Sequence, residues 1–176
     1  MHNFSNLKKY YFIDQYNPDQ FIKLNRDISL IWRSKHKDNK IQIIKTAKFC
    51  KKNNINLFLA NDIRLAIKLR LKGVYLSAHN KNLRLNLNSL LKDFKIIGSA
   101  HNIKELRIKK LQRVEEIFFS PIFKKKNNNP LGIYKLKLLF ENFQKDKIAL
   151  GGINKKNVKL LKFVNFKGFA GIEYFR

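Results

Sequence analysis

The sequence predicts an α/β fold, a (βα)8 TIM barrel that lacks its eighth helix, and three observations support this prediction. Eight short apolar runs alternate with amphipathic segments between residues 10 and 175. Each run is almost continuously apolar, as in a parallel sheet that is buried on both faces. Polar residues end nearly all the runs, and barrel enzymes gather their chemistry at the carboxyl ends of their strands. An open doubly wound sheet would show the same alternation, although eight strands with such ends favour closure.

In the first part of the chain, run length and residue spacing distinguish strands from helices. Continuous apolar runs predict strands at 10–15, 28–34 and 55–61. Helix 18–25 begins at Pro18, whose missing N–H is tolerated in a first turn. Apolar residues at helical spacing predict helices at 40–53 and 62–72.

The same alternation continues to the end of the sequence. Strands are expected at 73–78, 95–101, 115–123, 147–153 and 167–175, and helices at 87–93, 102–114, 133–144 and 154–165. The sequence stops one residue after the last expected strand, which leaves one apolar stripe without a covering helix. We expect a partner subunit in a homo-oligomer, or residues 1–9, to cover that stripe.

Composition indicates one soluble domain. The chain has 176 residues, of which 44% are hydrophobic, enough for one core, so we expect a single domain over residues 1–176. Cys50 is the one cysteine, which excludes an intramolecular disulfide and fits a reducing cytoplasm. No run of 18 uncharged apolar residues occurs, so we expect no association with a membrane.

The net charge of +26 raises the question of nucleic-acid binding. Of the 38 cationic residues 30 are Lys, spread over every segment, whereas a dedicated nucleic-acid reader would be richer in Arg. The densest cluster is "FKKKNNNP" at 123–130. We therefore interpret most of the charge as solvated surface, and nucleic acid as a disfavoured partner.

The ends of the expected strands carry residues suited to phosphate chemistry. These are Arg33 and Lys35, Asn61 and Asp62, Asn80, Ser99 and His101, Gly151 and Gly152, and Gly171. Fixed cations and glycine N–H groups can bind a phosphate, a carboxylate can bind a metal, and an imidazole can move a proton. In "KIALGGINKKN" the glycine pair precedes a helix expected to start at Asn154, so the pair is either a phosphate site or an ordinary turn.

Five segments in this order resemble the thiamine-phosphate synthase and TenI (thiazole tautomerase) family. They are "IWRSK", "LANDIRLAIKLRLKGVYL", "IIGSAHNIKEL", "FFSPIFKKKNNNPLG" and "IALGGINKKNV", and the match covers residues 10–175. The resemblance implies a (βα)8 barrel. It also implies that the protein either joins a pyrimidine diphosphate to a thiazole phosphate with Mg²⁺ and releases diphosphate, or isomerises the thiazole phosphate. A third possibility is a non-catalytic paralogue that binds thiamine or thiazole phosphates.

The resemblance also implies roles for individual residues. Arg33 and Lys35 would hold the diphosphate, and Asp62 would be the first magnesium carboxylate. Ser99 would bind a phosphate, His101 would act as acid or base, and Asn61 would contact substrate. The thiazole phosphate would be clamped by Gly151, Gly152 and Gly171. Asp62 could equally be a helix N-cap, and His101 a packing residue.

Four departures from the family pattern concern the same site. Asn80 replaces the second metal carboxylate, and Ile31 replaces a glutamine near the pyrimidine. Lys124–Lys126 stand where threonines grip the diphosphate, and Lys126 could bind it instead. Glu173 replaces a phosphate-binding serine. Together they suggest a weakened magnesium site and an altered substrate or lost activity.

Overall fold

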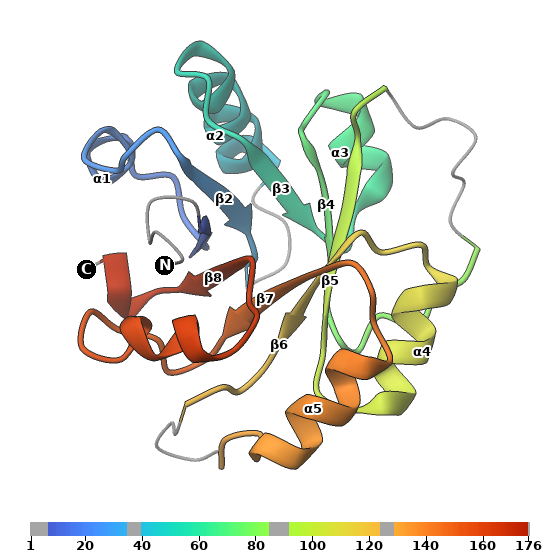
Figure 1. Cartoon of the computed structure of the whole chain (residues 1–176). Helices are drawn as coiled ribbons and strands as arrows, with labels where there is room; N and C mark the ends of the chain where they lie inside the picture. The colour runs from blue at the N-terminus through green and yellow to red at the C-terminus, as the bar shows by residue number, and fades with distance from the viewer. Residues whose placement is uncertain (1–6, 35–39, 85–91, 124–128, 176) are drawn as a thin grey trace.

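The computed structural model describes residues 7–34, 40–84, 92–123 and 129–175. Within these residues eight strands form a closed parallel barrel in chain order (Figure 1). Each strand pairs with the next, and β8 closes the ring by pairing with β1. The predicted closed barrel is confirmed, and the open sheet is excluded.

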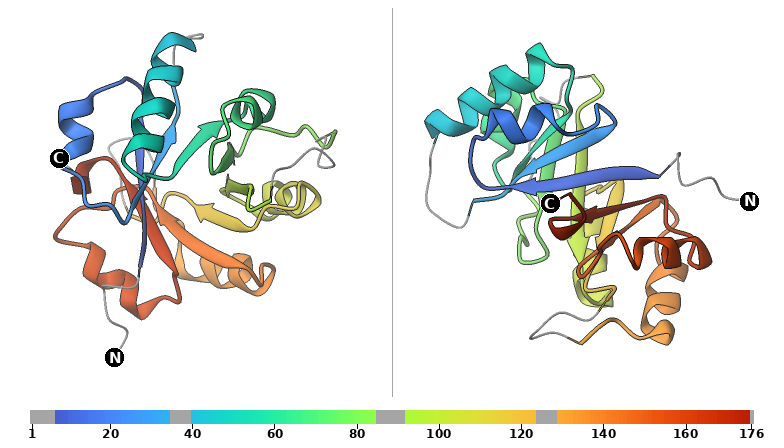
Figure 2. Two further views of the ribbon diagram at one scale, coloured as in Figure 1. Left: turned by 90° about the horizontal axis from the view of Figure 1, so that it is seen from above. Right: turned by 90° about the vertical axis from the view of Figure 1, so that its left-hand side faces the viewer.

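The strands are β1 (Lys8–Ile13), β2 (Ile28–Trp32), β3 (Leu57–Ala60), β4 (Gly73–Leu76), β5 (Lys95–Ala100), β6 (Glu116–Phe119), β7 (Asp146–Leu150) and β8 (Gly168–Gly171). The α-helices are α1 (Pro18–Ile22), α2 (Lys40–Lys52), α3 (Ile63–Lys68), α4 (Ile103–Leu111) and α5 (Ile133–Glu141). Two 3-10 helices follow, η3 (Val158–Phe163) and η4 (Glu173–Phe175). Figure 2 shows the helices arranged outside the strands.

All eight predicted strands are present, but two predictions near the C-terminus need correction. The helix expected at 154–165 is the 3-10 helix η3 and begins only at Val158. The last strand ends at Gly171, and residues 173–175 of the expected strand form η4. The helix expected at 87–93 falls mostly on residues outside those described.

Aromatic rings fill the barrel interior. Tyr10 and Phe118 pack edge to face with ring centroids 5.0 Å apart, and Phe12 packs on Tyr75 at 5.3 Å. Ile31 is fully buried in the same cluster, inside the barrel. The interior is therefore a packed core, and we expect a ligand to bind at a mouth of the barrel.

A buried carboxylate closes the core at the amino ends of the strands. Glu116, at the start of β6, accepts a hydrogen bond from the Tyr10 hydroxyl and one of 2.6 Å from Lys8 Nζ. Lys8 Nζ also donates to Asp146 at 2.7 Å. Burial alone would lower the pKa of Lys8, but hydrogen bonds to Asp146 and Glu116 and their charges outweigh it and raise the pKa.

The outer face of β8 and β1 is covered by residues of the chain itself. Phe175 of η4 packs on Tyr11 of β1 with ring centroids 5.2 Å apart, and Tyr174 packs on Phe169 of β8 at 4.7 Å. Tyr11 and Phe169 are both buried as a result. Residues of η4 thus cover part of the apolar stripe for which a partner subunit was expected, and the homo-oligomer stays a prediction.

Candidate active site

Arg33 follows β2 at the carboxyl end of the barrel, where its side chain is exposed. Its guanidinium carbon lies 4.5 Å from the centroid of the Phe12 ring. A cation stacked on an aromatic face is held in place while its N–H groups stay available to an anion.

Beneath Arg33 lies a small polar cluster inside the barrel. Ser99 of β5 is buried and hydrogen-bonds to the hydroxyl of Tyr75, as does Arg33. Burial raises the pKa of Tyr75, and the hydrogen bonds from Ser99 and Arg33 partly offset the rise. The structure therefore places Ser99 next to Arg33 through a tyrosine that the sequence did not single out.

A cavity of about 260 Å³ brings together Arg33 and the three predicted clamp glycines. Its lining consists of Phe12, Arg33, Leu150, Gly151, Gly152, Ile153, Gly171, Ile172 and Glu173. The glycines present backbone rather than side chains to this space, and Arg33 supplies a positive charge. Glu173 adds a carboxylate on the same wall, which would repel a bound phosphate unless a cation such as Arg33 lies between them.

Gly151 and Gly152 are required by the fold itself. Their φ angles are +96° and +71°, in the region that side chains other than glycine rarely adopt. A Cβ on Gly152 would lie 2.8 Å from the carbonyl oxygen of Phe123, and one on Gly151 would lie 3.0 Å from Pro121 Cα. The pair is therefore a turn that also lines the cavity, and phosphate binding there stays a prediction.

Asparagine side chains explain why no helix starts at Asn154. Asn154 Oδ1 accepts hydrogen bonds from the N–H groups of Lys156 and Asn157, at 2.9 and 3.0 Å. Asn157 in turn accepts from the Asn154 N–H and donates to the Gly152 carbonyl at 2.7 Å. These three N–H groups are engaged within the turn, so they are not the free donors that the start of a helix would offer to an anion.

His101 stands at the carboxyl end of β5, roughly opposite β1 in the barrel. Its Nδ1 lies 3.0 Å from Glu105 Oε2, which also accepts the His101 backbone N–H at 2.6 Å. A carboxylate oxygen only accepts hydrogen bonds, so Nδ1 carries the proton and Nε2 is left as the basic atom. The ring of His79 lies 6.4 Å away, centroid to centroid.

Asp62 and Asn61 sit at the end of β3. Asp62 is the N-cap of α3, and its Oδ1 accepts the Leu65 N–H at 2.9 Å. Asn61 has φ of +62°, and its Oδ1 accepts from the Ser77 N–H at 3.0 Å and from Asn80 Nδ2 at 3.2 Å. The N-cap interpretation of Asp62 is thus supported by geometry.

The hydrogen bonds of Asn80 do not fit a metal ligand. Its Oδ1 accepts from the Asn82 N–H at 3.1 Å and from Gln112 Nε2 at 3.2 Å, so hydrogens point where a cation would have to sit. Within the described residues, moreover, His, Cys, Asp and Glu side chains form no group of three that could hold a metal ion. Asn80 in this arrangement therefore does not fit the second ligand position of the magnesium site that the resemblance implied, and magnesium at Asp62 stays a prediction.

Comparison with known proteins decides the family. The family model described as thiamine monophosphate synthase matches residues 28–175. The chain belongs to the thiamine monophosphate synthase family. A thiamine-phosphate synthase of Prochlorococcus marinus subsp. pastoris is 33% identical over 130 residues, which cover 72% of this chain and 37% of that protein. One from Clostridium novyi is 29% identical over 126 residues, 69% of this chain and 61% of that protein.

The fold agrees with this family. A thiamine phosphate pyrophosphorylase from Pyrococcus furiosus superposes with a TM-score of 0.74 at 18% identity, over 97% of this chain and 88% of that chain. The matched part of this chain spans 37% of the Prochlorococcus marinus subsp. pastoris protein and 61% of the Clostridium novyi protein. No helix in the described part of the thiamine monophosphate synthase-family chain has the length and apolar character needed to cross a bilayer.

Two predicted site regions lie outside the described residues, and three residues were missed. The predicted site residues outside the described part of the chain are Lys35 and Lys124–Lys126. The residues that sequence reasoning missed are Phe12, Tyr75 and Glu105, which contact Arg33, Ser99 or His101. Glu105 could have been found from its spacing, because an asparagine N-cap followed three residues later by glutamate is a recognisable helix start.

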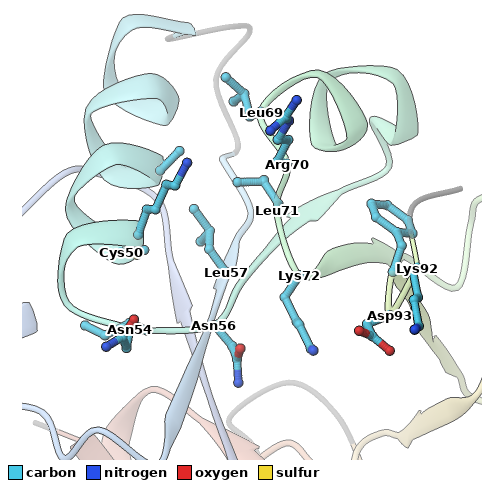
Figure 3. A pocket seen from close by; sticks show the side chains of 14 residues that line it. Cys50, Asn54, Asn56, Leu57, Leu69, Arg70, Leu71, Lys72, Lys92 and Asp93 are labelled. Carbon is cyan, nitrogen blue, oxygen red and sulfur yellow. The ribbon is translucent and has the colours of Figure 1, made fainter.

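A second cavity, of about 480 Å³, lies at the opposite end of the barrel (Figure 3). It is lined by residues that precede β3, β4 and β5, including Asn56, Lys72 and Asp93. None of the predicted site residues lines it. In a barrel enzyme this end contributes to stability rather than to catalysis.

Proposed function

We propose that this chain acts as a thiamine-phosphate synthase, joining a hydroxymethylpyrimidine diphosphate to a thiazole phosphate with release of diphosphate. Family membership supports this proposal, and the observation that carries it is the cavity shared by Arg33, the Gly151–Gly152 turn and Gly171. A cation beside a backbone-lined hollow suits a phosphorylated ligand.

In this reaction the bond between the pyrimidine methylene carbon and the diphosphate oxygen breaks, and its electron pair leaves with diphosphate. The lone pair of the thiazole nitrogen forms the new carbon–nitrogen bond. Negative charge grows on the leaving diphosphate, and a guanidinium held by Phe12 stabilises it more in the transition state than in the ground state. We propose Arg33 for this role, and Lys35, two residues further along the sequence, as a second cation for the diphosphate.

Replacement of Arg33 by Ala tests the proposal. We expect kcat and kcat/KM to fall together, by roughly 100-fold, because the interaction is made mainly in the transition state. Arg107→Ala, at an exposed position in α4, removes the same charge away from the cavity and should leave both constants unchanged. Equal rates for Arg33→Ala and wild type would contradict the role of Arg33.

One observation favours a second candidate, a thiazole phosphate tautomerase. The carboxylate of Glu105 orients His101 so that Nε2 can take up a proton and return it, and no metal is needed for such a transfer. A tautomerase would convert thiazole phosphate isomers in EDTA, and His101→Asn would abolish that conversion. Activity that requires both substrates would exclude this candidate.

The proposed function also bears on the ligands of the chain and on its location. Small phosphorylated molecules are the expected ligands, and a cytoplasmic location fits their chemistry. A non-catalytic paralogue would instead show thermal stabilisation by thiamine or thiazole phosphate without any product.

A further inference from the structure

Asn80 connects three parts of the structure. Its Nδ2 donates to Asn61 at the end of β3, and its Oδ1 holds the N–H of Asn82 in the loop after β4. Its backbone carbonyl accepts from Lys109 Nζ at 2.7 Å and from Gln112 Nε2 at 3.1 Å, at and just beyond the last turn of α4. The same loop carries His79 to its place beside His101.

Lys109 is an unusual anchor because it is fully buried. Its exposed fraction is 0%, and its Nζ also donates to Gln112 Oε1 at 2.8 Å. A Cβ on Gly98 would lie 3.3 Å from Lys109 Cδ, so the glycine leaves room for the lysine stem. Burying an ammonium is unfavourable unless its hydrogen bonds are made. In the described residues those bonds go to Asn80 and to Gln112, which also binds the loop.

A divalent cation and this ammonium are poorly compatible neighbours. The ammonium of Lys109 bonds directly to the backbone carbonyl of Asn80, and Gln112 links it to Oδ1, the atom of Asn80 that would ligate a metal. Like charges at such short range repel strongly in a buried environment. The oxygen of Asn80 is, in addition, already occupied by two donors.

We propose that the ammonium of Lys109 replaces a divalent cation as the group that fixes the loop Ser77–Asn82, and that this mouth binds phosphorylated ligands without metal. The second half of the proposal rests on the proposed function, and the first half does not. Lys109 and Gln112 are positioning residues, because they act on the loop rather than on a substrate.

Magnesium alone, without any ligand, provides the first test. Thermal unfolding of wild type, Asn80→Asp and Asn80→Asp/Lys109→Met is measured in MgCl₂ from zero to about 10 mM. The highest concentration is on the order of ten times the Kd of the weakest Ca²⁺ sites in proteins. We expect no change for wild type and none for Asn80→Asp, whose new carboxylate would pair with Lys109. The double variant has two carboxylates without the ammonium and should be stabilised by magnesium. Stabilisation of the wild type by magnesium would overturn the proposal.

Hydrogen exchange tests the positioning role. In Lys109→Met the amides of Ser77 and Asn82 should exchange roughly tenfold faster than in wild type, as loss of a buried hydrogen bond predicts. Lys110→Met, at the exposed neighbouring position, removes the same charge and should change neither amide. Unchanged exchange in Lys109→Met would refute the role, and if that variant does not fold, the wild-type magnesium titration decides.

The ligand test uses diphosphate with EDTA or with MgCl₂. Equal stabilisation of the wild type in both supports metal-free binding. Stabilisation that needs magnesium overturns the proposal but leaves the proposed function intact. No stabilisation in either condition contradicts the proposed function, and the titration with magnesium alone then still decides the role of Lys109.

Discussion

Gly171 differs from the other two clamp glycines in what the fold demands of it. Gly151 and Gly152 need positive φ angles, whereas the φ of Gly171 lies outside that range. A Cβ on Gly171 would lie 3.5 Å from its nearest neighbours, which is ordinary contact. The fold would accept alanine there, so a need for glycine would come from the cavity it lines.

We predict that Gly171→Ala weakens binding of thiazole phosphate without destabilising the protein. The added methyl group would occupy space in a cavity of about 260 Å³. Isothermal titration should show a rise in Kd of about tenfold, and urea unfolding should show a change within about 0.5 kcal/mol. Unaltered affinity would mean that the phosphate does not approach this wall.

Glu105 should determine which nitrogen of His101 carries the proton. In wild type the ¹⁵N shifts of the imidazole should report protonated Nδ1 when the ring is neutral. Glu105→Ala should let both tautomers form, whereas Glu105→Gln keeps an acceptor oxygen and should largely preserve the wild-type pattern. The same spectrum for Glu105→Ala and wild type would show that the carboxylate does not orient the ring.

Residue roles were only partly accessible from sequence. Arg33 and the glycines stand at strand ends, which any barrel brings together, so their meeting could be predicted. The contacts of Arg33 with Phe12 and Tyr75 depend on how interior rings pack, and local sequence does not encode that packing. Lys109 lies three residues after buried Leu106, on the same helix face, but a lysine in that position is usually assumed to reach solvent.

At the scale of elements, the turn after β7 is held against the loop after β6. Ile122 N–H donates to the Leu150 carbonyl at 3.0 Å, and Phe123 N–H donates to the Gly151 carbonyl at 3.1 Å. The glycine pair therefore fixes two neighbouring loops at the mouth, one of which continues into the lysine-rich segment.

Gly152→Ala should break this junction. A side chain at positive φ costs about 1–2 kcal/mol, and the clash with the Phe123 carbonyl adds to it. The free energy of unfolding, measured in urea, should fall by about 2 kcal/mol or more. Gly132→Ala is the control, because a Cβ there meets nothing within 4 Å, and the change should cost only the difference between glycine and alanine at an N-cap, about 0.5–1 kcal/mol. Equal losses in the two variants would contradict the packing described.

The strands could be predicted because short, continuous apolar runs are typical of strands buried on both faces of a parallel sheet. The type of the last helical segment was not, since the side chains of Asn154 and Asn157 capture backbone N–H groups that a helix would need. Such competition depends on local geometry rather than on hydrophobic spacing.

At the scale of the whole molecule, the two ends of the barrel differ in purpose. The amino end is closed by the hydrogen bonds of Glu116 with Lys8 and Tyr10, which stabilise the barrel. The carboxyl end keeps Arg33 and His101 accessible.

The closed end predicts lower stability in alkali. Burial, together with the charge and hydrogen bond of Glu116, raises the pKa of Tyr10, and the pKa of Lys8 is raised as well. Above about pH 10 the unfolded chain releases these protons while the folded chain keeps them, so the free energy of unfolding falls as pH rises.

Tyr10→Phe tests this prediction. The variant loses the hydrogen bond to Glu116 and should be less stable at pH 7 by about 1–3 kcal/mol. Above about pH 10 the free energy of unfolding of the variant should nevertheless fall less steeply with pH than that of wild type. The two slopes should differ by about 1.4 kcal/mol per pH unit, because the variant releases one proton fewer on unfolding. Urea unfolding at several pH values measures both effects, and parallel pH profiles would contradict the assignment.

The most direct test of the proposed synthase activity is product formation by the wild-type chain. The protein is incubated with hydroxymethylpyrimidine diphosphate and thiazole phosphate, and thiamine phosphate and diphosphate are quantified by mass spectrometry. We expect both products in equal amounts with wild type and a strong loss with Arg33→Ala. Absence of thiamine phosphate from a folded wild-type protein that binds both substrates would contradict the proposed synthase activity.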